Sequence, residues 1–333
     1  APQGASARSA PESFSPLVKR VLPAVVNIAV TETVSGNDVA AELPPELKDT
    51  PLGREFRRRF GNRRQQMMGA GSGFIIDPTG VIVTNNHVVD HADKIVVSLT
   101  DGRQLPAKVL GRDELTDVAV IKVESKESLP SVSWGDSRKA EVGDWILAGG
   151  NPFGLGGSVS VGIISAEGRD LGSGPFDNFL QLDAPINPGN SGGPVFNMDG
   201  QVIGVSSVIV SPTGASVGIG FAIPSETVSR IVTQLLSKGS IERGWLGVAV
   251  DDHEGAVTIA SVDHNGPAAK SGIKPGDVIL AINGDRIESS RGLIRAVAAV
   301  APGNSVRVTV RRQGREIDVP VNIGRRPTEQ SAG

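Results

Sequence analysis

The stretch APINPGNSGGPVF, residues 184–196, places a single serine, Ser191, among glycines and ends abruptly at Pro194 and a short apolar run. An ordinary surface turn explains the glycines, because glycine adopts positive φ at no steric cost. A nucleophile explains them as well, because a serine that attacks a carbonyl needs backbone N–H groups beside it for the oxyanion. This stretch leaves both interpretations open, and the remainder of the chain has to separate them.

The composition indicates a globular protein with more than one domain. Its 333 residues exceed what one hydrophobic core usually holds, and 39% of them are apolar. The 42 glycines and 22 prolines indicate many tight turns between short strands. The net charge of −3 is too small to imply a nucleic-acid partner. With four histidines and no cysteine, we expect no metal, no cofactor and no disulfide.

No stretch of the sequence has the character of a transmembrane segment. The longest charge-free run, residues 200–225, is interrupted by Pro212, Gly214 and Pro224 and is typical of strands and turns. A spanning helix needs about 20 predominantly apolar residues, and no run approaches that length. The chain begins at Ala1 rather than Met, which is expected either after removal of a leader or in a trimmed sequence.

Residues 69–222 have the pattern of an all-β region. Short apolar runs alternate with turn residues at 77–80 (DPTG), 101–102 (DG) and 199–200 (DG). Asp-Gly between alternating apolar residues is a strong hairpin signal. A region of about 150 residues built this way suits β-barrels.

The first clear helical period follows this region. In SETVSRIVTQLL, residues 225–236, Ser225 is the predicted N-cap. One face of the predicted helix carries Val228, Ile231, Val232, Leu235 and Leu236. Residues from 244 to about 325 then indicate a separate unit of strands and helices.

Two arrangements of an active site include Ser191. Residues 189–193 match G-x-S-x-G, the nucleophile elbow of α/β hydrolases, but Pro194 and a hairpin follow where that fold requires a helix. The acid and histidine also follow the serine in that fold, whereas His253 and His264 belong to the C-terminal unit. The elbow interpretation therefore fails.

The second arrangement places histidine first, acid second and serine last, divided between two β-barrels. His87 ends a predicted strand in TNNHVV, and Asp117 begins one in ELTDVAVIKV. His87 would accept the Ser191 proton and later protonate the leaving amine, while Asp117 fixes the imidazole. The N–H groups of Gly189 and Ser191, with Asn190 between them, would form the oxyanion hole.

With TNNHVV, TDVAVIKV and GNSGGPV together, the chain closely resembles the HtrA/Deg family of trypsin-like serine proteases. The resemblance extends from Ser15 to Gly324. It implies a mainly β fold: two six-stranded, chymotrypsin-like barrels with the active site between them, followed by an α+β PDZ domain. The residues on the family's catalytic positions are His87, Asp117 and Ser191.

The expected domain organisation follows from the patterns and the resemblance together. We expect a disordered N-terminus at 1–12, the protease domain at 13–238, a linker at 239–243, the PDZ domain at 244–326 and a tail at 327–333. The protease domain would carry a long loop at 31–69. Six arginines in GREFRRRFGNRR, residues 53–64, favour a solvated loop, with a docking surface for an acidic partner as the alternative.

The C-terminal unit carries its own indication of function. GWLGVAV, residues 244–250, resembles a PDZ carboxylate-binding loop followed by the strand that pairs with a ligand. We expect Trp245, Leu246, Gly247 and Val248 to bind peptide C-termini, with the strand edge adding the peptide as a further strand. The alternative is a small domain that only packs on the protease.

The expected substrate pocket is apolar. Pro185 and Ile186 stand where a trypsin-type pocket would have an acid, and Ile209 lies on the expected opposite wall, which favours cleavage after small aliphatic residues. The resemblance implies a homotrimer or larger homo-oligomer formed through Phe14 and Leu17. It also implies a periplasmic location of the mature form after leader removal, with a mitochondrial single-PDZ relative as the alternative.

The main hypothesis is thus an ATP-independent endopeptidase that degrades unfolded or damaged envelope proteins. A non-enzymatic holdase chaperone or peptide-binding scaffold, with a mostly resting protease domain, is the alternative.

Overall fold

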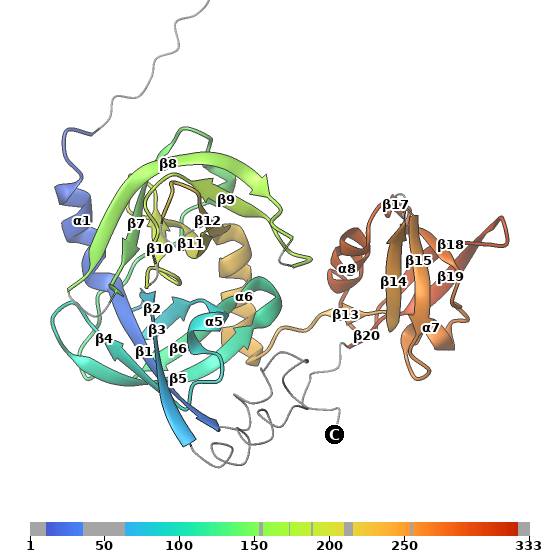
Figure 1. Cartoon of the computed structure of the whole chain (residues 1–333), viewed down its shortest axis with the longest axis horizontal. Helices are drawn as coiled ribbons and strands as arrows, with labels where there is room; N and C mark the ends of the chain where they lie inside the picture. The colour runs from blue at the N-terminus through green and yellow to red at the C-terminus, as the bar shows by residue number, and fades with distance from the viewer. Residues whose placement is uncertain are drawn as a thin grey trace, which may run out of the picture. The chain divides into compact units, whose positions relative to one another are not determined.

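The computed structural model describes residues 11–35, 64–152, 156–172, 174–187, 189–209, 216–253 and 256–325 (Figure 1). The chain divides into two compact units. The first comprises residues up to 169 together with 178–240, and the second comprises 170–177 and 241 onward. Most of the predicted disordered N-terminus, the tail from 327 and the centre of the predicted loop at 31–69 lie outside the described residues.

The first unit contains two closed barrels of six strands each, which confirms the predicted fold class. The first barrel has the strand order β1-β2-β3-β6-β5-β4. Its strands are β1 (Val25–Ser35), β2 (Arg64–Asp77), β3 (Val81–Thr84), β4 (Lys94–Ser98), β5 (Gln104–Asp113) and β6 (Val118–Val123). A cluster of buried aliphatic side chains fills it, among them Ile28, Ile82 and Ile121.

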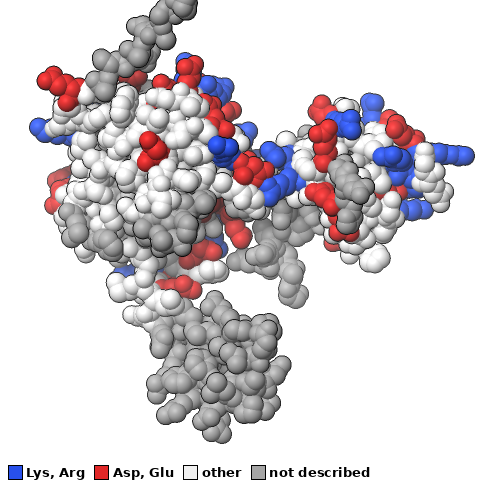
Figure 2. All heavy atoms as spheres, turned by 45° about the horizontal axis from the view of Figure 1, so that its top comes forward, with Lys and Arg blue, Asp and Glu red and all other residues white. Residues whose placement is uncertain are grey.

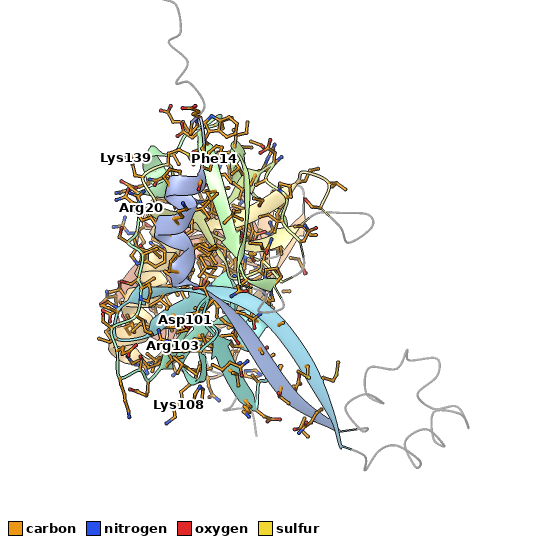
Figure 3. The ribbon with its side chains drawn as sticks, turned by 90° about the vertical axis from the view of Figure 1, so that its left-hand side faces the viewer. Phe14, Arg20, Asp101, Arg103, Lys108 and Lys139 are labelled. Atoms are coloured by element: carbon orange, nitrogen blue, oxygen red, sulfur yellow. The ribbon has the colours of Figure 1, made fainter. Side chains whose placement is uncertain are left out.

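The stretch expected as a loop at 31–69 is partly strand. β1 continues to Ser35 and β2 begins at Arg64, and the two strands pair along their whole length from Val25↔Phe74 to Ser35↔Arg64. Beyond the barrel they form a two-stranded ribbon (Figure 3). Backbone pairing satisfies the peptide groups there without an apolar core, so the polar sequence did not indicate strand.

The second barrel has the strand order β10-β11-β12-β9-β8-β7. Its strands are β7 (Trp145–Gly150), β8 (Ser158–Arg169), β9 (Phe179–Leu182), β10 (Pro194–Phe196), β11 (Val202–Ile209) and β12 (Gly220–Pro224). Every described side chain of β10 and β12 is buried. The three hairpins predicted at residues 77–80, 101–102 and 199–200 join β2 to β3, β4 to β5 and β10 to β11.

Short helices surround these barrels: α1 (Ser15–Val21), α5 (Asn86–Val89) and α6 (Ser225–Lys238), with the 3₁₀ turns η1 (Leu22–Ala24), η2 (Glu114–Thr116) and η3 (Ser137–Lys139). The predicted N-cap of α6 is wrong by one residue. Pro224 occupies the cap, and the Ser225 hydroxyl instead donates to the Gly135 carbonyl oxygen at 2.7 Å. Four of the five predicted apolar positions are buried, but Leu236 is 47% exposed.

The second unit is a five-stranded antiparallel path, β14-β15-β16-β18-β19, with β17 paired to β16 and a separate β13–β20 pair. Its strands are β13 (Gly244–Trp245), β14 (Val248–His253), β15 (Ala256–Val262), β16 (Val278–Ile282), β17 (Asp285–Arg286), β18 (Ser305–Arg312), β19 (Arg315–Asn322) and β20 (Gly324–Arg325). The helices are α7 (Pro267–Lys270) and α8 (Ser290–Ala298). One hydrophobic core, which includes Leu246, Ile259 and Leu293, joins sheet and helices.

Candidate active site

The loop that carries Ser191 packs so closely on its surroundings that two of its glycine positions have no room for a side chain. A Cβ on Gly192 would lie 2.3 Å from the carbonyl oxygen of Ser72, and one on Gly193 would lie 2.1 Å from that of Gly149. Gly189 and Gly192 also have positive φ angles, +96° and +83°. The glycines are therefore required by close backbone approach as well as by the turn, which an ordinary surface loop would not need.

Backbone hydrogen bonds fix the course of this loop. The N–H of Gly192 donates to the Ser206 carbonyl at 2.7 Å, and the N–H of Gly193 donates to the Asn190 carbonyl at 2.9 Å. The Asn190 N–H is used inside the loop by the Asn187 carbonyl at 3.0 Å. The Asn190 amide is thus engaged, which leaves the N–H groups of Gly189 and Ser191 as the candidates for an oxyanion.

His87 and Asp117 come from the first barrel and form a tight pair. His87 lies in the single helical turn α5, directly after β3, and Asp117 follows η2 with a left-handed φ of +55°. The His87 Nδ1 lies 2.8 Å from Oδ2 and 3.0 Å from Oδ1 of Asp117. The same carboxylate accepts the His87 backbone N–H at 3.0 Å. Because Nδ1 faces the carboxylate, Nε2 is the ring nitrogen left to face another group.

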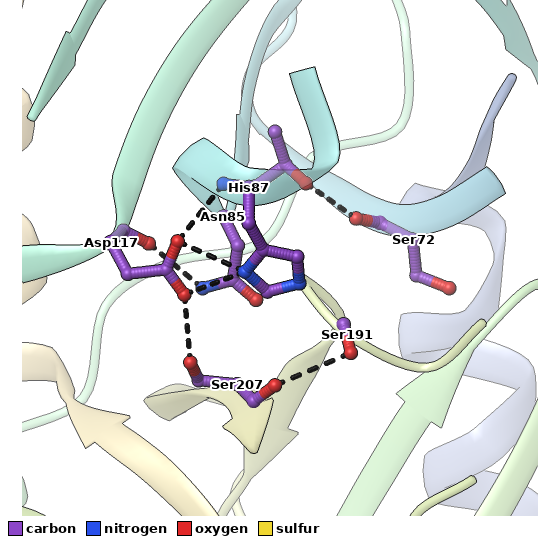
Figure 4. Close-up of polar contacts among 7 residues, drawn as sticks. Ser72, Asn85, His87, Asp117, Ser191 and Ser207 are labelled. Carbon is purple, nitrogen blue, oxygen red and sulfur yellow. Dashed lines mark hydrogen bonds and ion pairs between the residues drawn. The ribbon is translucent and has the colours of Figure 1, made fainter. Parts of the chain in front are cut away.

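Figure 4 shows the imidazole between Asp117 and Ser191, so the three predicted residues come together at one place between the barrels. The Ser191 hydroxyl, however, donates to the carbonyl oxygen of Ser207 at 3.3 Å. Among the described residues, no hydrogen bond joins it to His87. Hydrogen bonds between catalytic groups often tighten only when substrate binds, so this rotamer is compatible with a nucleophile.

The sequence analysis missed Ser207 as part of this site. Its hydroxyl donates to Oδ2 of Asp117 at 2.8 Å, while its carbonyl oxygen accepts the Ser191 hydroxyl (Figure 4). Asn85, which is fully buried, adds a bond from its Nδ2 to the Asp117 carbonyl at 2.9 Å. Ser207 lies in an apolar strand, and no local signal separates it from its neighbour Ser206. Only the approach of β11 to η2 reveals its role.

The described residues include no cluster of three or more histidine and acidic side chains that could hold a metal ion. No helix among them is long and apolar enough to cross a membrane. On the face shown in Figure 2, most of the described surface of the first unit is uncharged, and acidic and basic side chains mix around its rim.

The comparisons with known proteins agree with this geometry. A family model of trypsin-like peptidase domains matches residues 71–205, and a model of PDZ domains matches residues 244–323. A DegP-like periplasmic serine endoprotease of Brucella suis biovar 1 (strain 1330) is 43% identical over 357 residues, which cover 95% of this chain and 69% of that protein. The chain belongs to the HtrA family of serine proteases. It is a serine endoprotease with a PDZ domain, as the resemblance implied.

Solved structures of HtrA proteases are similar over almost the whole chain. A variant of the HtrA-type protease AlgW with a decapeptide has a TM-score of 0.85 at 38% identity, covering 96% of this chain and all of that one. A serine endoprotease from Yersinia pestis has a TM-score of 0.73 at 34% identity, with 96% and 100% coverage.

The expected pocket residues lie in the second barrel of this HtrA protease. Ile186 is 2% exposed and belongs to the barrel core, and Ile209 packs against the same cluster. A Cβ on Gly220 would lie 2.8 Å from Cγ1 of Ile186, so β12 packs directly on this side chain. Ile186 is therefore a core side chain of the second barrel, and Ile209 packs at the edge of that core.

In the PDZ unit, the four predicted peptide-binding residues are consecutive: Trp245 ends β13, Leu246 and Gly247 form the turn, and Val248 begins β14. Gly247 has a φ of +78°, and Leu246 is buried in the core. The Leu246 and Gly247 carbonyls accept the N–H groups of Ala268 and Asp263, both at 2.9 Å, which fixes the turn. Val248 then starts β14, the edge strand of the sheet, against which α8 packs.

Proposed function

We propose that this HtrA protease is an ATP-independent endopeptidase that degrades unfolded or damaged proteins in the periplasm. The periplasmic names of relatives such as those of Brucella suis and Halomonas elongata support the compartment. The glycine-rich segment GAGSGF, residues 69–74, lacks the Gly-Lys-Ser/Thr ending of a P-loop, so it supplies no energy for unfolding. Substrates must then reach Ser191 already unfolded.

The proposed mechanism uses the three residues between the barrels. Ser191 Oγ attacks the substrate carbonyl while Nε2 of His87 accepts its proton, and Asp117 holds the imidazole by Nδ1 and stabilises the imidazolium. The observation that carries this assignment is the His87–Asp117 hydrogen bond, because it turns Nε2 toward the serine.

The remaining steps follow from the same groups. The N–H groups of Gly189 and Ser191 would stabilise the oxyanion of the tetrahedral intermediate. The imidazolium then protonates the leaving amine and the carbon–nitrogen bond breaks, which leaves an acyl group on Ser191. A water molecule, deprotonated by His87, attacks the acyl carbon. The ester bond to Ser191 Oγ then breaks, Oγ takes the proton back from His87, and the acid is released.

Cleavage of casein, an unfolded protein, tests this proposal. We expect the wild-type chain to degrade casein faster than a folded control protein at the same concentration, without ATP. The Ser191→Ala variant should be inactive on both. Equal cleavage of casein by the wild type and by Ser191→Ala would show that Ser191 is not the nucleophile.

We further propose that the enzyme cleaves after small aliphatic residues, because a pocket formed beside Ile186 and Ile209, which pack in the same apolar cluster, would be apolar. Peptides that differ only in the residue before the cleaved bond should rank Val, Ala, Ile or Leu above Lys or Arg. Ile186→Asp should not improve cleavage after small aliphatic residues, and an improvement would show that the pocket is assigned to the wrong wall.

A holdase with a resting protease domain is the second candidate. The observation that favours it is the hydrogen bond from Ser191 to the Ser207 carbonyl, which keeps the hydroxyl from His87. A holdase would suppress aggregation of an unfolded client equally well in wild type and in Ser191→Ala. If the wild type cleaves casein and Ser191→Ala does not, a holdase activity is excluded as the main function.

We propose that the PDZ unit binds peptide C-termini at Trp245, Leu246, Gly247 and Val248. The backbone N–H groups of this turn would hold the carboxylate, and the open edge of β14 would pair with the peptide. A peptide with a free C-terminus should bind, and the same peptide with an amidated C-terminus should not.

We also propose a homotrimer or larger homo-oligomer formed through the N-terminal segment. Phe14, the residue directly before α1 (Figure 3), contacts Trp145, with ring centroids 5.8 Å apart and ring planes tilted by 56°. Beside them lies an open hollow of about 1170 Å³ that includes Val142, which is 60% exposed. Leu17 is buried against its own unit, so Phe14 and not Leu17 is available to a second copy. Sedimentation of wild type and Phe14→Ala tests this assignment.

A further inference from the structure

Strand β2 runs next to the loop that carries Ser191. At this point β2 has one serine, Ser72, between two glycines, Gly71 and Gly73. A Cβ on Gly71 would lie 2.7 Å from both methyl groups of Val88, and one on Gly73 would lie 2.8 Å from Cδ1 of Ile28. Neither position has room for a side chain. Of the three residues Gly71, Ser72 and Gly73, only Ser72 can therefore present a polar side chain to the loop that carries Ser191.

Ser72 connects the first barrel to three points on the second. Its backbone N–H donates to the Ser191 carbonyl at 2.8 Å. Its hydroxyl donates to the Gly189 carbonyl at 2.6 Å and accepts the Asn151 N–H at 2.8 Å. The residue is completely buried, so no water competes for these bonds. A hydroxyl has one proton to donate, and here that proton is committed to the Gly189 carbonyl.

The Gly189 carbonyl needs such a partner because of the residue that carries it. Gly189 adopts a φ of +96°, which excludes residues with a Cβ. The same absence of a Cβ leaves the backbone free to rotate about φ and ψ, so nothing within Gly189 holds its conformation. Rotation there would turn its N–H away from a substrate carbonyl. The Gly189 carbonyl and the Asn190 N–H belong to one peptide plane. The Ser72 hydroxyl holds its oxygen at 2.6 Å and the Asn187 carbonyl holds its N–H at 3.0 Å, and together these two bonds oppose that rotation.

We infer that Ser72 is a positioning residue of the protease: its hydroxyl holds Gly189 in the conformation that directs the oxyanion N–H groups at the substrate. The inference rests on the oxyanion hole proposed above. Ser72 itself does not touch the substrate. Its effect is exerted on the transition state, in which the oxyanion carries a full charge, and only weakly on the bound substrate.

This distinction sets the size of the effect. Removal of a whole oxyanion donor lowers kcat by about 10²–10³-fold. Ser72→Ala leaves the donor in the chain but loosens it, so we expect kcat to fall by about 10–100-fold with KM within about threefold of wild type.

Ser225 provides a matched control within the same unit. It is also a buried serine whose hydroxyl donates to one backbone carbonyl, that of Gly135, and accepts one backbone N–H, that of Ser137. Ser225→Ala therefore removes two hydrogen bonds of the same kinds as Ser72→Ala does, but at the start of α6 and away from Ser191. We expect it to lower the melting temperature about as much as Ser72→Ala and to leave kcat within about twofold of wild type.

The decisive experiment compares two ligands of each variant, using the full chain. One is a peptide boronate, which forms a tetrahedral adduct with the active serine, and the other is the matching peptide without the boronate. Ser72→Ala should weaken the boronate by the same 10–100-fold factor as kcat and leave the plain peptide unchanged. Ser225→Ala should change neither ligand.

Three results would overturn the inference: an unchanged kcat in Ser72→Ala, an equal loss in Ser225→Ala, or an equal loss of boronate and plain peptide. If Ser72→Ala does not fold, Ser72→Cys carries the same test, because its thiol keeps the bulk but is a weak donor. Cleavage that persists in Ser191→Ala would instead contradict the proposed mechanism. That result is distinct from the three results above, which concern Ser72 alone.

Discussion

Replacing Gly192 with alanine tests why the nucleophile loop contains its glycines. The new Cβ would lie 2.3 Å from both the Ser72 carbonyl oxygen and Oγ1 of Thr84. Both atoms belong to buried residues of the first barrel, so the loop rather than the barrel has to move. Because Gly192 follows Ser191, the proposed nucleophile, we expect the Gly192→Ala variant to lose both stability and activity.

The structure separates two contributions to that loss. A left-handed φ in a residue with a Cβ costs about 1–2 kcal/mol. Forcing an extra methyl group into a packed site adds about 1–3 kcal/mol. The two contributions together predict a loss of about 2–5 kcal/mol in the free energy of unfolding. A displacement of Ser191 by about 1 Å would lower kcat by about 10²-fold.

Gly102→Ala is the control, because Gly102 has a φ of +89° and its Cβ would meet nothing within 4 Å. It should show only the backbone cost, about 1–2 kcal/mol, with full activity. Calorimetry of the first unit and cleavage of a chromogenic peptide measure both quantities. If the two variants lose equal stability and Gly192→Ala keeps its activity, close packing is not the reason for the glycine.

Other substitutions test the remaining contacts. Ser207→Ala removes the hydrogen bond to Oδ2 of Asp117 and should lower kcat in peptide cleavage by about tenfold with KM unchanged. The hydrogen-bonded Arg312 holds the pKa of the Asp277 carboxyl below its usual range. The ionised pair therefore stabilises the folded PDZ unit fully above about pH 4, the pKa of the unfolded carboxyl, and this stabilisation is lost as the pH falls through the lower pKa of the folded state. Asp277→Asn should thus lower the stability of the PDZ unit by about 1.5–3 kcal/mol at pH 7, a deficit that thermal unfolding should show shrinking in acid. Gly247→Ala places a Cβ 3.1 Å from Gly266 at a φ of +78°, and should weaken binding of a C-terminal peptide about tenfold in calorimetric titration.

Local chemistry explains how far the sequence predicted the fold. The Asp-Gly and Asp-Pro-Thr-Gly turns and the apolar runs between them predicted the three hairpins, because turn residues and side-chain alternation act over a few neighbours. The ribbon formed by β1 and β2 was not predicted. Its strands are polar, and each residue pairs with one far along the chain, 29 positions away in the case of Ser35 and Arg64.

The amino-acid sequence by itself predicted His87, Asp117 and Ser191 as the catalytic residues, in that order, because each stands in a short motif of residues suited to this chemistry. Tertiary structure alone decided what surrounds them. Ser207 contacts Asp117, and Ser72 contacts Gly189, only because the two barrels pack on each other and bring together residues that are 90 and 117 positions apart in the chain. A buried serine has no sequence signature of its own, since the partner that satisfies its hydroxyl is supplied by a distant part of the fold.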